Sequence, residues 1–499
     1  MTIKITRRKF LVVTGAATAA ACASPSGARD GGDASADAIE DREDTLAPDA
    51  QLEDVVPETP VDAVDDAFDA APEAEVDAGS DPNPTGVPEN LTLFPLGIMA
   101  GDMTAERAMC WTNYTGTLPL VVRVIEMSGA RFVRVVYEHD CSVTPAGYVH
   151  EDASGLSAGT RYSYVFLVRD AGGFIARSSI GRFRAAVASD SMEVITFAGT
   201  SCTHQRGRPF PVLQDCANRP GVDFFVHGGD HVYCDGATTL ADYRAKYAEN
   251  WPSAGMRALH SSMGMYCTLD DHEVDNDFDP ETVPAAKLAS ARAAYFEHRA
   301  QRRDPMAPDR IWRSFRWGRT LELFVLDCRT ERRPSSRTGA NPIYVSRAQI
   351  DWLKSSLMAS TAVFKFIVNS VPITNFPLIF DIGAADRWEG YAAQRQELLD
   401  FIQMQTVTGV WWLSGDFHLA SAGSVEPSGP LSTMREILMG PGGNNPNVLF
   451  ATLGAPQFDF ATGTSNYTVL RADPIARTVE VTFVSGTGTE LFRRRYTSA

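Results

Sequence analysis

The stretch DFFVHGGD (Asp223–Asp230) decides the fold class of this chain. Its apolar residues follow one another without alternation, as in a strand buried on both faces, and the run stops abruptly at two glycines and a carboxylate. Five other runs have this form: VITFAGTSC (194–202), GMYCTLDDHE (264–273), LELFVLDCR (321–329), FKFIVNSVP (364–372) and GVWWLSGDFH (409–418). Amphipathic segments lie between them, at 238–251, 287–302, 346–360 and 394–405. This alternation predicts an α/β fold with a largely central sheet that helices cover.

The pattern upstream of this region is different. Short alternating runs, separated by Gly, Ser, Pro and Asp turns, lie at 107–114, 119–127, 131–138, 161–170 and 179–186. Their spacing predicts an immunoglobulin-like β-sandwich domain at 91–190, followed by the α/β domain at 191–499. The chain closes with two more alternating runs (467–473 and 478–485), which predict an antiparallel finish.

The net charge of −17 belongs to one segment. Residues 1–29 carry +5, and residues 30–90, with 20 Asp and Glu against one Arg, carry −19, so that the part from Leu91 onward carries only −3. Residues 23–90 have almost no large apolar side chain, which predicts a disordered acidic linker. Because the folded part is nearly neutral and offers no broad basic surface, we expect no specific nucleic-acid binding.

The first 22 residues have the form of an export signal. A twin arginine (Arg7, Arg8) precedes the apolar run Phe10–Ala21, which is shorter than the roughly 20 residues of a membrane-spanning helix. This pattern predicts export in the folded state by the twin-arginine machinery, to the periplasm or cell surface. The run of alanines before Cys22 resembles a lipoprotein cleavage box, so we expect a lipid anchor at Cys22, with simple cleavage as the alternative.

Seven more cysteines lie beyond Cys22. In an exported chain they can form disulfides. Cys110 and Cys141 are the favoured pair, because both lie in the predicted sandwich domain.

The acidic stretch LDDHEVDND (Leu269–Asp277) requires an explanation. A solvated loop is the simplest one. A calcium loop that starts at Asp275 fails on spacing, because Pro280 stands where the turn glycine belongs. The remaining explanation is a catalytic metal site, which requires further ligands from elsewhere in the chain.

Such ligands do follow the other apolar runs. Each is ordinary alone, since an Asp after a strand is usually a cap and a Cys there is usually core. The strand-end residues are Cys202, His204, Asp230, Tyr233, Asp271, His272, Asn369, Asp416 and His418. Because ligands of α/β sheets bind beyond the carboxyl ends of the strands, this set predicts a two-metal site. Thiolate and phenolate ligands suit a ferric ion and carboxylates a harder divalent ion, so we expect unlike metals.

The order of four motifs carries a family resemblance. SC (201–202), GGDHVYCDG (228–236), DDHEVDND (270–277) and LSGDFH (413–418) together resemble the PhoD-like alkaline phosphatases of the metallophosphoesterase superfamily. Supporting stretches include LDCRTERR (326–333) and DRWEGYAAQRQELL (386–399), and the resemblance extends from about Leu91 to the C-terminus.

The resemblance implies a sandwich domain followed by a four-layer αββα catalytic domain with an iron and calcium centre. By position, the Fe(III) ligands are Cys202, Asp230, Tyr233 and His418. Asp230 bridges the two metals, and Asp271 and Asp416 hold the second metal, with Ca(II) expected there and its identity left open. His272 matches the histidine that lies near the phosphate.

Four assignments stay open at this stage. His204 stands where members of the family tend to carry Gln, and is either an extra metal ligand or part of the phosphate pocket, which we favour. His231 is a candidate for a phosphate contact or for a contact that supports the metal ligands from behind. Asp270 belongs either to the site or to the solvated stretch. Asn369 is either a site residue or the cap of a strand end.

The predicted function is that of an exported phosphoric ester hydrolase. A metal-bridging hydroxide attacks phosphorus in line, and His272 assists the leaving group. One rival hypothesis makes the preferred substrate a diester. Another is a surface-tethered binding lipoprotein whose metal site is structural; the presence of His272 beside the ligands argues against it, because a closed structural site does not need such a group.

Overall fold

The computed structural model of the protein describes residues 82–376, 385–447 and 455–498. The predicted signal (1–22), the lipidation site Cys22 and the predicted linker as far as residue 81 lie outside the described residues. In the part of the chain that the structure describes, no helix combines the length and the apolar character needed to cross a membrane.

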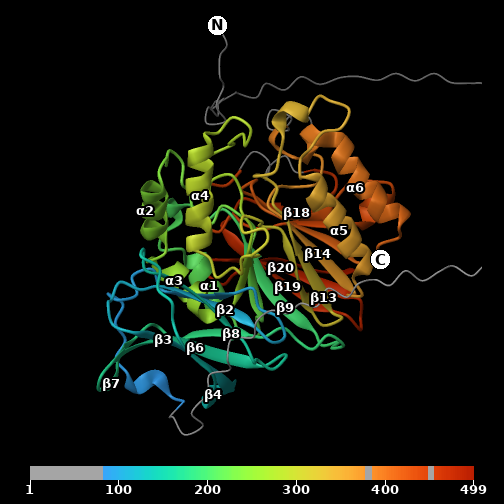
Figure 1. Ribbon diagram of the computed structural model, residues 1–499. Helices are drawn as coiled ribbons and strands as arrows, with labels where there is room; N and C mark the ends of the chain where they lie inside the picture. The colour runs from blue at the N-terminus through green and yellow to red at the C-terminus, as the bar shows by residue number, and fades with distance from the viewer. Residues whose placement is uncertain (1–81, 377–384, 448–454, 499) are drawn as a thin grey trace, which may run out of the picture. The chain divides into compact units, whose positions relative to one another are not determined.

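Two β-sheets form the centre of the α/β region (Figure 1). The first has nine strands in the order β21-β20-β19-β9-β10-β11-β1-β2-β5. Its strands are β1 (Ile98–Gly101), β2 (Ala108–Asn113), β5 (Tyr148–Ala153), β9 (Ile195–Thr200), β10 (Phe224–His227), β11 (Met265–Cys267), β19 (Asn466–Asp473), β20 (Thr478–Ser485) and β21 (Glu490–Thr497). The central strands β9, β10 and β11 run parallel, and the C-terminal strands are antiparallel, as predicted.

The second sheet has seven strands in the order β12-β13-β14-β15-β17-β16-β18. They are β12 (Arg313–Trp317), β13 (Leu321–Val325), β14 (Phe364–Asn369), β15 (Val410–Ser414), β16 (Ala420–Ser424), β17 (Arg435–Leu438) and β18 (Phe458–Thr462). Strands β13, β14, β15 and β17 are parallel, so their carboxyl ends lie at one edge.

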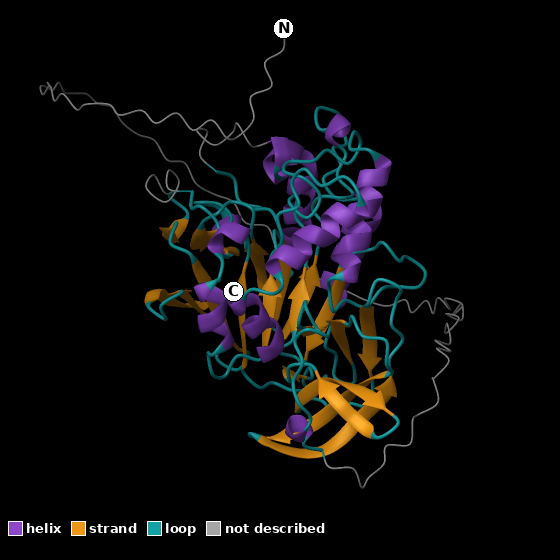
Figure 2. Ribbon diagram, turned by 90° about the vertical axis from the view of Figure 1, so that its left-hand side faces the viewer, coloured by secondary structure: helices purple, strands orange, loops and turns teal. Residues whose placement is uncertain are grey.

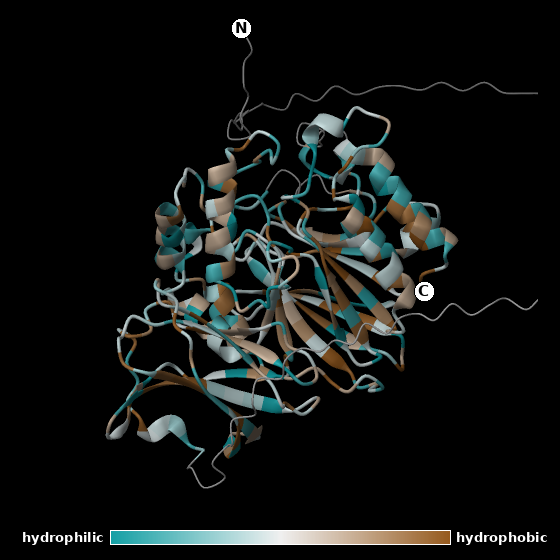
Figure 3. Cartoon of the chain, in the orientation of Figure 1, coloured by the Kyte–Doolittle hydropathy of each residue, from teal (hydrophilic) through white to brown (hydrophobic). Residues whose placement is uncertain are grey.

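The two sheets pack face to face because their strands are apolar on both sides. Phe224 and Val226 of β10 belong to the core between the sheets, whereas Phe225 belongs to the core beneath the helices. The Phe197 ring packs edge-on against Phe366 of the other sheet, with centroids 5.1 Å apart. Figure 3 shows the hydrophobic residues gathered on these strands. The alternation of side-chain direction along a strand therefore supplies both cores from one apolar run.

Helices cover the outer faces, which gives a helix–sheet–sheet–helix order. Helices α1 (Pro211–Ala217), α2 (Leu240–Asn250), α3 (Ala254–Ser262) and α4 (Ala285–Glu297) pack on the nine-stranded sheet. Helices α5 (Arg347–Ala359) and α6 (Ala392–Met404) pack on the seven-stranded sheet. Side chains cap the N-termini of two of these helices. Thr239 and Asp242 form a capping box on α2, and Ser346 caps α5. The predicted α/β fold is confirmed.

A five-stranded antiparallel sheet lies in the N-terminal region (Figure 2). It contains β3 (Leu120–Ser128), β4 (Arg131–Asp140), β6 (Arg161–Asp170), β7 (Gly173–Arg177) and β8 (Gly181–Arg184). Three strands of the predicted sandwich region at 91–190, β1, β2 and β5, extend the nine-stranded sheet instead of this one. Gly101 permits this junction, since a Cβ there would lie 2.2 Å from the Ala300 carbonyl oxygen. The immunoglobulin-like class stays a prediction.

The residues just before Leu91, which lie inside the predicted linker, contact the N-terminal sheet. Asn83 caps a short 3-10 helix, η1 (Pro84–Gly86). The Asn90 N–H then donates to the Arg177 carbonyl oxygen at 2.9 Å, which attaches the segment to β7. The expected Cys110–Cys141 disulfide is also absent, because all seven cysteines of the described ranges are free thiols.

Candidate metal centre

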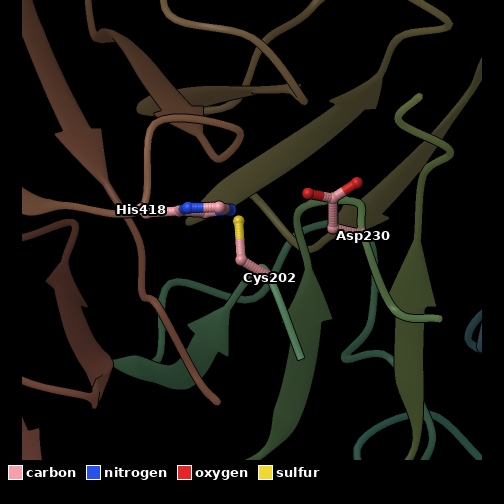
Figure 4. Close-up of side chains that lie close together, drawn as sticks. All are labelled: Cys202, Asp230 and His418. Carbon is pink, nitrogen blue, oxygen red and sulfur yellow. The ribbon is translucent and has the colours of Figure 1, made fainter. Parts of the chain in front are cut away.

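Three predicted ligands converge from three separate loops (Figure 4). Cys202 follows β9, Asp230 follows β10 and His418 follows β15. One ligand atom from each, the thiol sulfur, a carboxylate oxygen and an imidazole nitrogen, lies within 4.8 Å of the others. Cys202 and Asp230 are buried, and His418 is partly exposed, so the group opens to one side only.

Tyr233 joins this group. Its hydroxyl donates to Asp230 Oδ2 at 2.9 Å and lies 3.2 Å from His418 Nε2. The four residues assigned to iron from the sequence are therefore neighbours in space. They offer sulfur, carboxylate, phenol and imidazole donors, which is a mixed ligand set of the kind that transition metals accept.

The backbone is strained at these positions. Cys202, Asp230, Asp416 and His418 all have left-handed φ values, between 51° and 60°. Non-glycine residues occupy that region at a cost, and they persist there when the surrounding structure requires it. Next to Asp230, Gly229 has φ of 100°, and a Cβ at this glycine would lie 2.6 Å from Asp270 Cβ. The loops after β10 and β11 thus approach one another so closely that no side chain fits at position 229.

A second cluster consists of carboxylates. Oxygens of Asp270, Asp271 and Asp416 lie within 4.8 Å of one another, and one atom each of Asp230, Asp271 and His272 forms a further group of the same width. Asp230 therefore belongs both to the cysteine–histidine group and to the group that contains Asp271. A carboxylate that bridges two metals must belong to both groups in this way.

The acidic stretch divides as expected, with one addition. Asp275 pairs with Lys287 at 2.7 Å, and Asp279 accepts the Glu281 N–H at 2.8 Å, so both are structural. Asp277, by contrast, has an oxygen within 4.8 Å of oxygens of Asp271 and of Asp386.

Arg329 lies within the carboxylate cluster, although the sequence did not single it out as a site residue. The side chain is fully buried, and it donates to Asp270, to Asp386 and, at 2.9 Å, to Asp416. Burial opposes the charge of the guanidinium, but the surrounding carboxylates raise the pKa of Arg329 well above its usual value. The same guanidinium is the main reason why the pKa of Asp271 is lowered in spite of burial.

The residues present fit a metal centre. Asp270 Oδ2 and Asp271 Oδ1 are buried without a hydrogen-bond partner. Burial, with Asp230 nearby, raises the pKa of the Cys202 thiol, and burial likewise raises the pKa of Asp230 and of Tyr233. A bound cation would reverse these shifts, because it stabilises the deprotonated thiolate, carboxylate and phenolate.

His272 faces the cluster with a carboxylate behind it. Its Nδ1 lies 2.7 Å from Asp235 Oδ1, and its ring centroid lies 4.0 Å from that of Tyr233. Burial lowers the pKa of His272, but Asp230, Asp271 and Asp235 outweigh that effect and raise it. Asp235 therefore orients the imidazole and favours its protonated form. Asp235 went unrecognised in the sequence, although it is the second acid of GGDHVYCDG.

His204 also lies beside Tyr233, with ring centroids 4.5 Å apart. Its Nδ1 accepts the Arg206 N–H at 3.0 Å. A neutral imidazole whose Nδ1 accepts carries its proton on Nε2 and presents a donor there. This arrangement favours a contact with a phosphate oxygen over metal ligation, which would need a lone pair on Nε2.

Two candidates take structural positions. His231 is fully buried; its ring stacks on His227 at 3.9 Å, and its Nε2 lies 3.3 Å from His260 Nε2. This packed position behind the loop favours a supporting role for His231 over a phosphate contact.

The amide of Asn369 holds the end of β14. It accepts from Trp388 Nε1 at 3.0 Å and from the Cys328 thiol, and it donates to the Val371 carbonyl oxygen. Of the two alternatives left open for Asn369, these bonds favour the strand-end cap.

Asn444 is a site residue that sequence reasoning missed. Its Nδ2 lies 2.6 Å from the Tyr233 hydroxyl and 2.8 Å from His418 Nε2. The residue comes from the glycine-rich stretch PGGNNPN (441–447), and the glycines were the one signal of a loop that approaches other backbone closely.

The fold and this cluster define an α/β protein with a metal-binding site at its strand ends. Residues 197–446 match the sequence model of the PhoD-like phosphatase family, and residues 83–187 match that of the PhoD-like phosphatase N-terminal domain. The chain belongs to the PhoD-like phosphatase family. The resemblance seen in the motifs is thereby confirmed.

Individual proteins agree with this assignment. The chain is 27% identical over 387 residues to alkaline phosphatase D of Bacillus subtilis (strain 168), across 66% of this chain and 65% of that protein, slightly under two thirds of its length. A solved structure of PhoD matches with a TM-score of 0.69 and 22% identity, over 81% of this chain and 89% of that one. Purple acid phosphatase PPD1 from yellow lupin seeds matches with a TM-score of 0.57 and 13% identity, over 80% and 73%. At these identities the two solved structures show the shared fold.

Proposed function

We propose that this protein is a metal-dependent phosphoric ester hydrolase. The observation that carries the proposal is the convergence of Cys202, Asp230 and His418 from three loops, beside a separate carboxylate cluster. Family membership supports it. We assign Fe(III) to Cys202, Asp230, Tyr233 and His418.

We assign a second metal, with Ca(II) as the expected ion, to the carboxylates. Asp230 is shared between the two metals, and Asp271 and Asp416 hold the second one. When bound, the metals supply positive charge for the phosphoryl oxygens and lower the pKa of a water.

The protein side chains supply proton transfer and orientation. His272, held by Asp235, donates a proton to the leaving oxygen of the ester. His204 donates from Nε2 to a phosphoryl oxygen, because its Nδ1 is already an acceptor. Asn444 fixes the Tyr233 hydroxyl and the His418 ring from the partly exposed side.

The test is hydrolysis of an aryl phosphate monoester and of the matching diester by the full chain, with metal content measured in parallel. Asp230→Asn should remove both metals and nearly all turnover. His272→Asn should lower kcat by about 10²–10⁴-fold and leave the metal content intact, because His272 acts on the proton and not on a metal. Asp275→Asn is the matched control, since Asp275 pairs with Lys287 in the same acidic stretch and should change neither value.

Three outcomes discriminate between the hypotheses. Turnover that Asp230→Asn abolishes supports the hydrolase, and the ratio of the two rates shows whether monoesters or diesters are preferred. Equal metal loss in the Asp230 and His272 variants would refute the division of roles. A chain that binds metal and turns over neither ester would be a surface-tethered binding protein with a structural metal site.

We further propose export through the twin-arginine route and a lipid anchor at Cys22. The support is the sequence Arg7-Arg8, the apolar run that follows it and the alanines before Cys22. Cys22→Ser should move the exported protein from the membrane to the soluble fraction, and Lys at positions 7 and 8 should retain it in the cytoplasm. Membrane attachment of the Cys22→Ser protein would contradict the anchor.

A further inference from the structure

Glu273 is fully buried directly behind the metal-ligand loops. Its two carboxylate oxygens accept three backbone N–H groups. Oε2 accepts from Asp230 at 3.1 Å and from Asp270 at 2.9 Å, and Oε1 accepts from His231 at 2.6 Å. One side chain therefore binds the backbone of both the loop after β10 and the loop after β11.

The backbone conformation of the β10 loop makes this possible. Asp230 has φ of 55° and follows Gly229 with φ of 100°. Left-handed conformations turn successive N–H groups toward one point, which forms a concave site for an anion. The carboxylate of Glu273 occupies that position, while the side chain of Asp230 points to the ligand group with Cys202 and His418.

A buried arginine holds the other side of Glu273. Arg299 Nη2 lies 3.6 Å from Glu273 Oε1, and the exposed fraction of the Arg299 side chain is 1%. Its guanidinium carbon lies 4.9 to 5.3 Å from the ring centroids of Tyr247, Trp251 and Tyr295. Arg299 thus places a positive charge near the carboxylate, at a distance longer than a hydrogen bond.

We propose that Glu273 is a positioning residue for the metal centre. Through the N–H groups of Asp230 and Asp270 it sets the separation between the carboxylates of Asp230 and Asp271, and so the geometry that two metals require. It acts through the backbone, and its own oxygens are used by N–H groups. This inference rests on the proposed metal centre, but not on the substrate.

The test compares two buried glutamates. Glu436 is also fully buried; it accepts the N–H groups of Ile373 and Thr374, each at 2.9 Å, and the Ser414 hydroxyl. Glu436 therefore also accepts several buried hydrogen bonds, but the residues that donate them are not proposed metal ligands. Glu273→Gln and Glu436→Gln make the same chemical change in the full chain.

We expect Glu273→Gln to lower metal affinity by roughly 10–100-fold, as is usual for partners of metal ligands, and to leave less than the wild-type metal content after dialysis. Glu436→Gln should lower the melting temperature to a similar degree and keep the wild-type metal content. Equal metal content in the two variants would overturn the proposal and make Glu273 a stability residue only.

A conservative variant covers the case in which Glu273→Gln does not fold. Glu273→Asp keeps the charge, but its carboxylate is one methylene too far from the N–H groups. It should fold and bind metal with intermediate affinity; wild-type affinity would overturn the proposal. Metal content is measured without substrate. If the wild-type chain bound metal but hydrolysed no ester, the proposed function would be refuted, but the metal content of the Glu273 variants would still test the role of Glu273.

Discussion

Arg299 and Arg329 are both fully buried, but their surroundings are opposite. Arg329 lies among carboxylates and donates to Asp270, Asp386 and Asp416. Arg299 lies among aromatic rings, and its one ion pair, to Glu273, is 3.6 Å long. The first arginine neutralises groups that a metal would also neutralise. The second belongs to the packing behind the ligand loops. We therefore expect metal removal to change the effect of a mutation at Arg329 on the free energy of unfolding, but not the effect of a mutation at Arg299.

The largest effect is expected from Arg329→Met. It leaves buried carboxylates without their guanidinium, and loss of one partner of a buried ion pair costs about 3–5 kcal/mol. The free energy of unfolding should fall by that amount in chelator, and a divalent cation should restore part of it. The measurement is denaturant unfolding with and without chelator. A chelator effect no larger than in the wild type would show that Arg329 and the metals do not share the carboxylates.

Arg299→Met should have a smaller effect. The variant loses a long ion pair and three cation–π contacts, each worth about 0.5–2 kcal/mol, while Met retains part of the packing, so we expect about 2–3 kcal/mol. The same unfolding experiment should show the wild-type response to chelator. A larger response than that of Arg329→Met would reverse the comparison.

Acid should weaken the Arg299 region first. Burial, and then Arg299 among other charges, lowers the pKa of His260 to about 3 and that of His298 to about 3, against 6.5 in the unfolded chain. Between those values the unfolded state binds more protons, so stability is complete above 6.5 and falls as the pH drops. Each histidine should cost about 1–2 kcal/mol at pH 5.

The Asp271 carboxylate should not respond in this range. The pKa of Asp271 is lowered from 3.8, so its contribution is present above 3.8 and is lost only as the pH falls below that value. His298→Gln should reduce the loss in unfolding free energy between pH 7 and pH 5 by the contribution of this one histidine, about 1–2 kcal/mol. An unchanged pH response in that variant would place the acid sensitivity elsewhere.

The smallest effect is expected at an exposed arginine. Arg347 pairs with Asp351 and Glu397, but the exposed fraction of its side chain is 55%. Exposed ion pairs contribute about 0–1 kcal/mol, so Arg347→Ala should change the unfolding free energy by less than about 1 kcal/mol, with or without chelator. A loss near that of Arg329→Met would mean that the number of carboxylates matters more than burial.

Much of the metal centre could be predicted from the chain. Cys202, Asp230, Asp271 and His418 each follow an apolar run, and the structure brings them to the ends of the parallel strands. Their convergence could be predicted because the position of such a residue along the chain also sets its position at the sheet edge. The position of His231 could not be predicted for a related reason. It follows the same run as Asp230, but the left-handed turn at Asp230 places it among His227 and His260.

The remaining site residues were missed because their roles depend on partners far along the chain. Arg329 is 87 residues from Asp416, and Asn444 is 211 residues from Tyr233. No local pattern marks an arginine that will meet carboxylates, as opposed to one that will meet solvent. Glu273 stood inside a recognised motif, yet its role lies in backbone N–H groups of another loop, which no side-chain pattern reports.

The sequence by itself determined the α/β class, the ligand types and the order in which they occur, because strand burial and side-chain chemistry are local properties. Tertiary structure alone decided how the N-terminal strands and the charges are used. Gly101 joins β1 to β11 because Ala300 leaves no room for a side chain. Arg329 and Arg299 differ in role because one is folded against carboxylates and the other against rings. Packing between distant segments sets such contacts, and a linear pattern does not contain them.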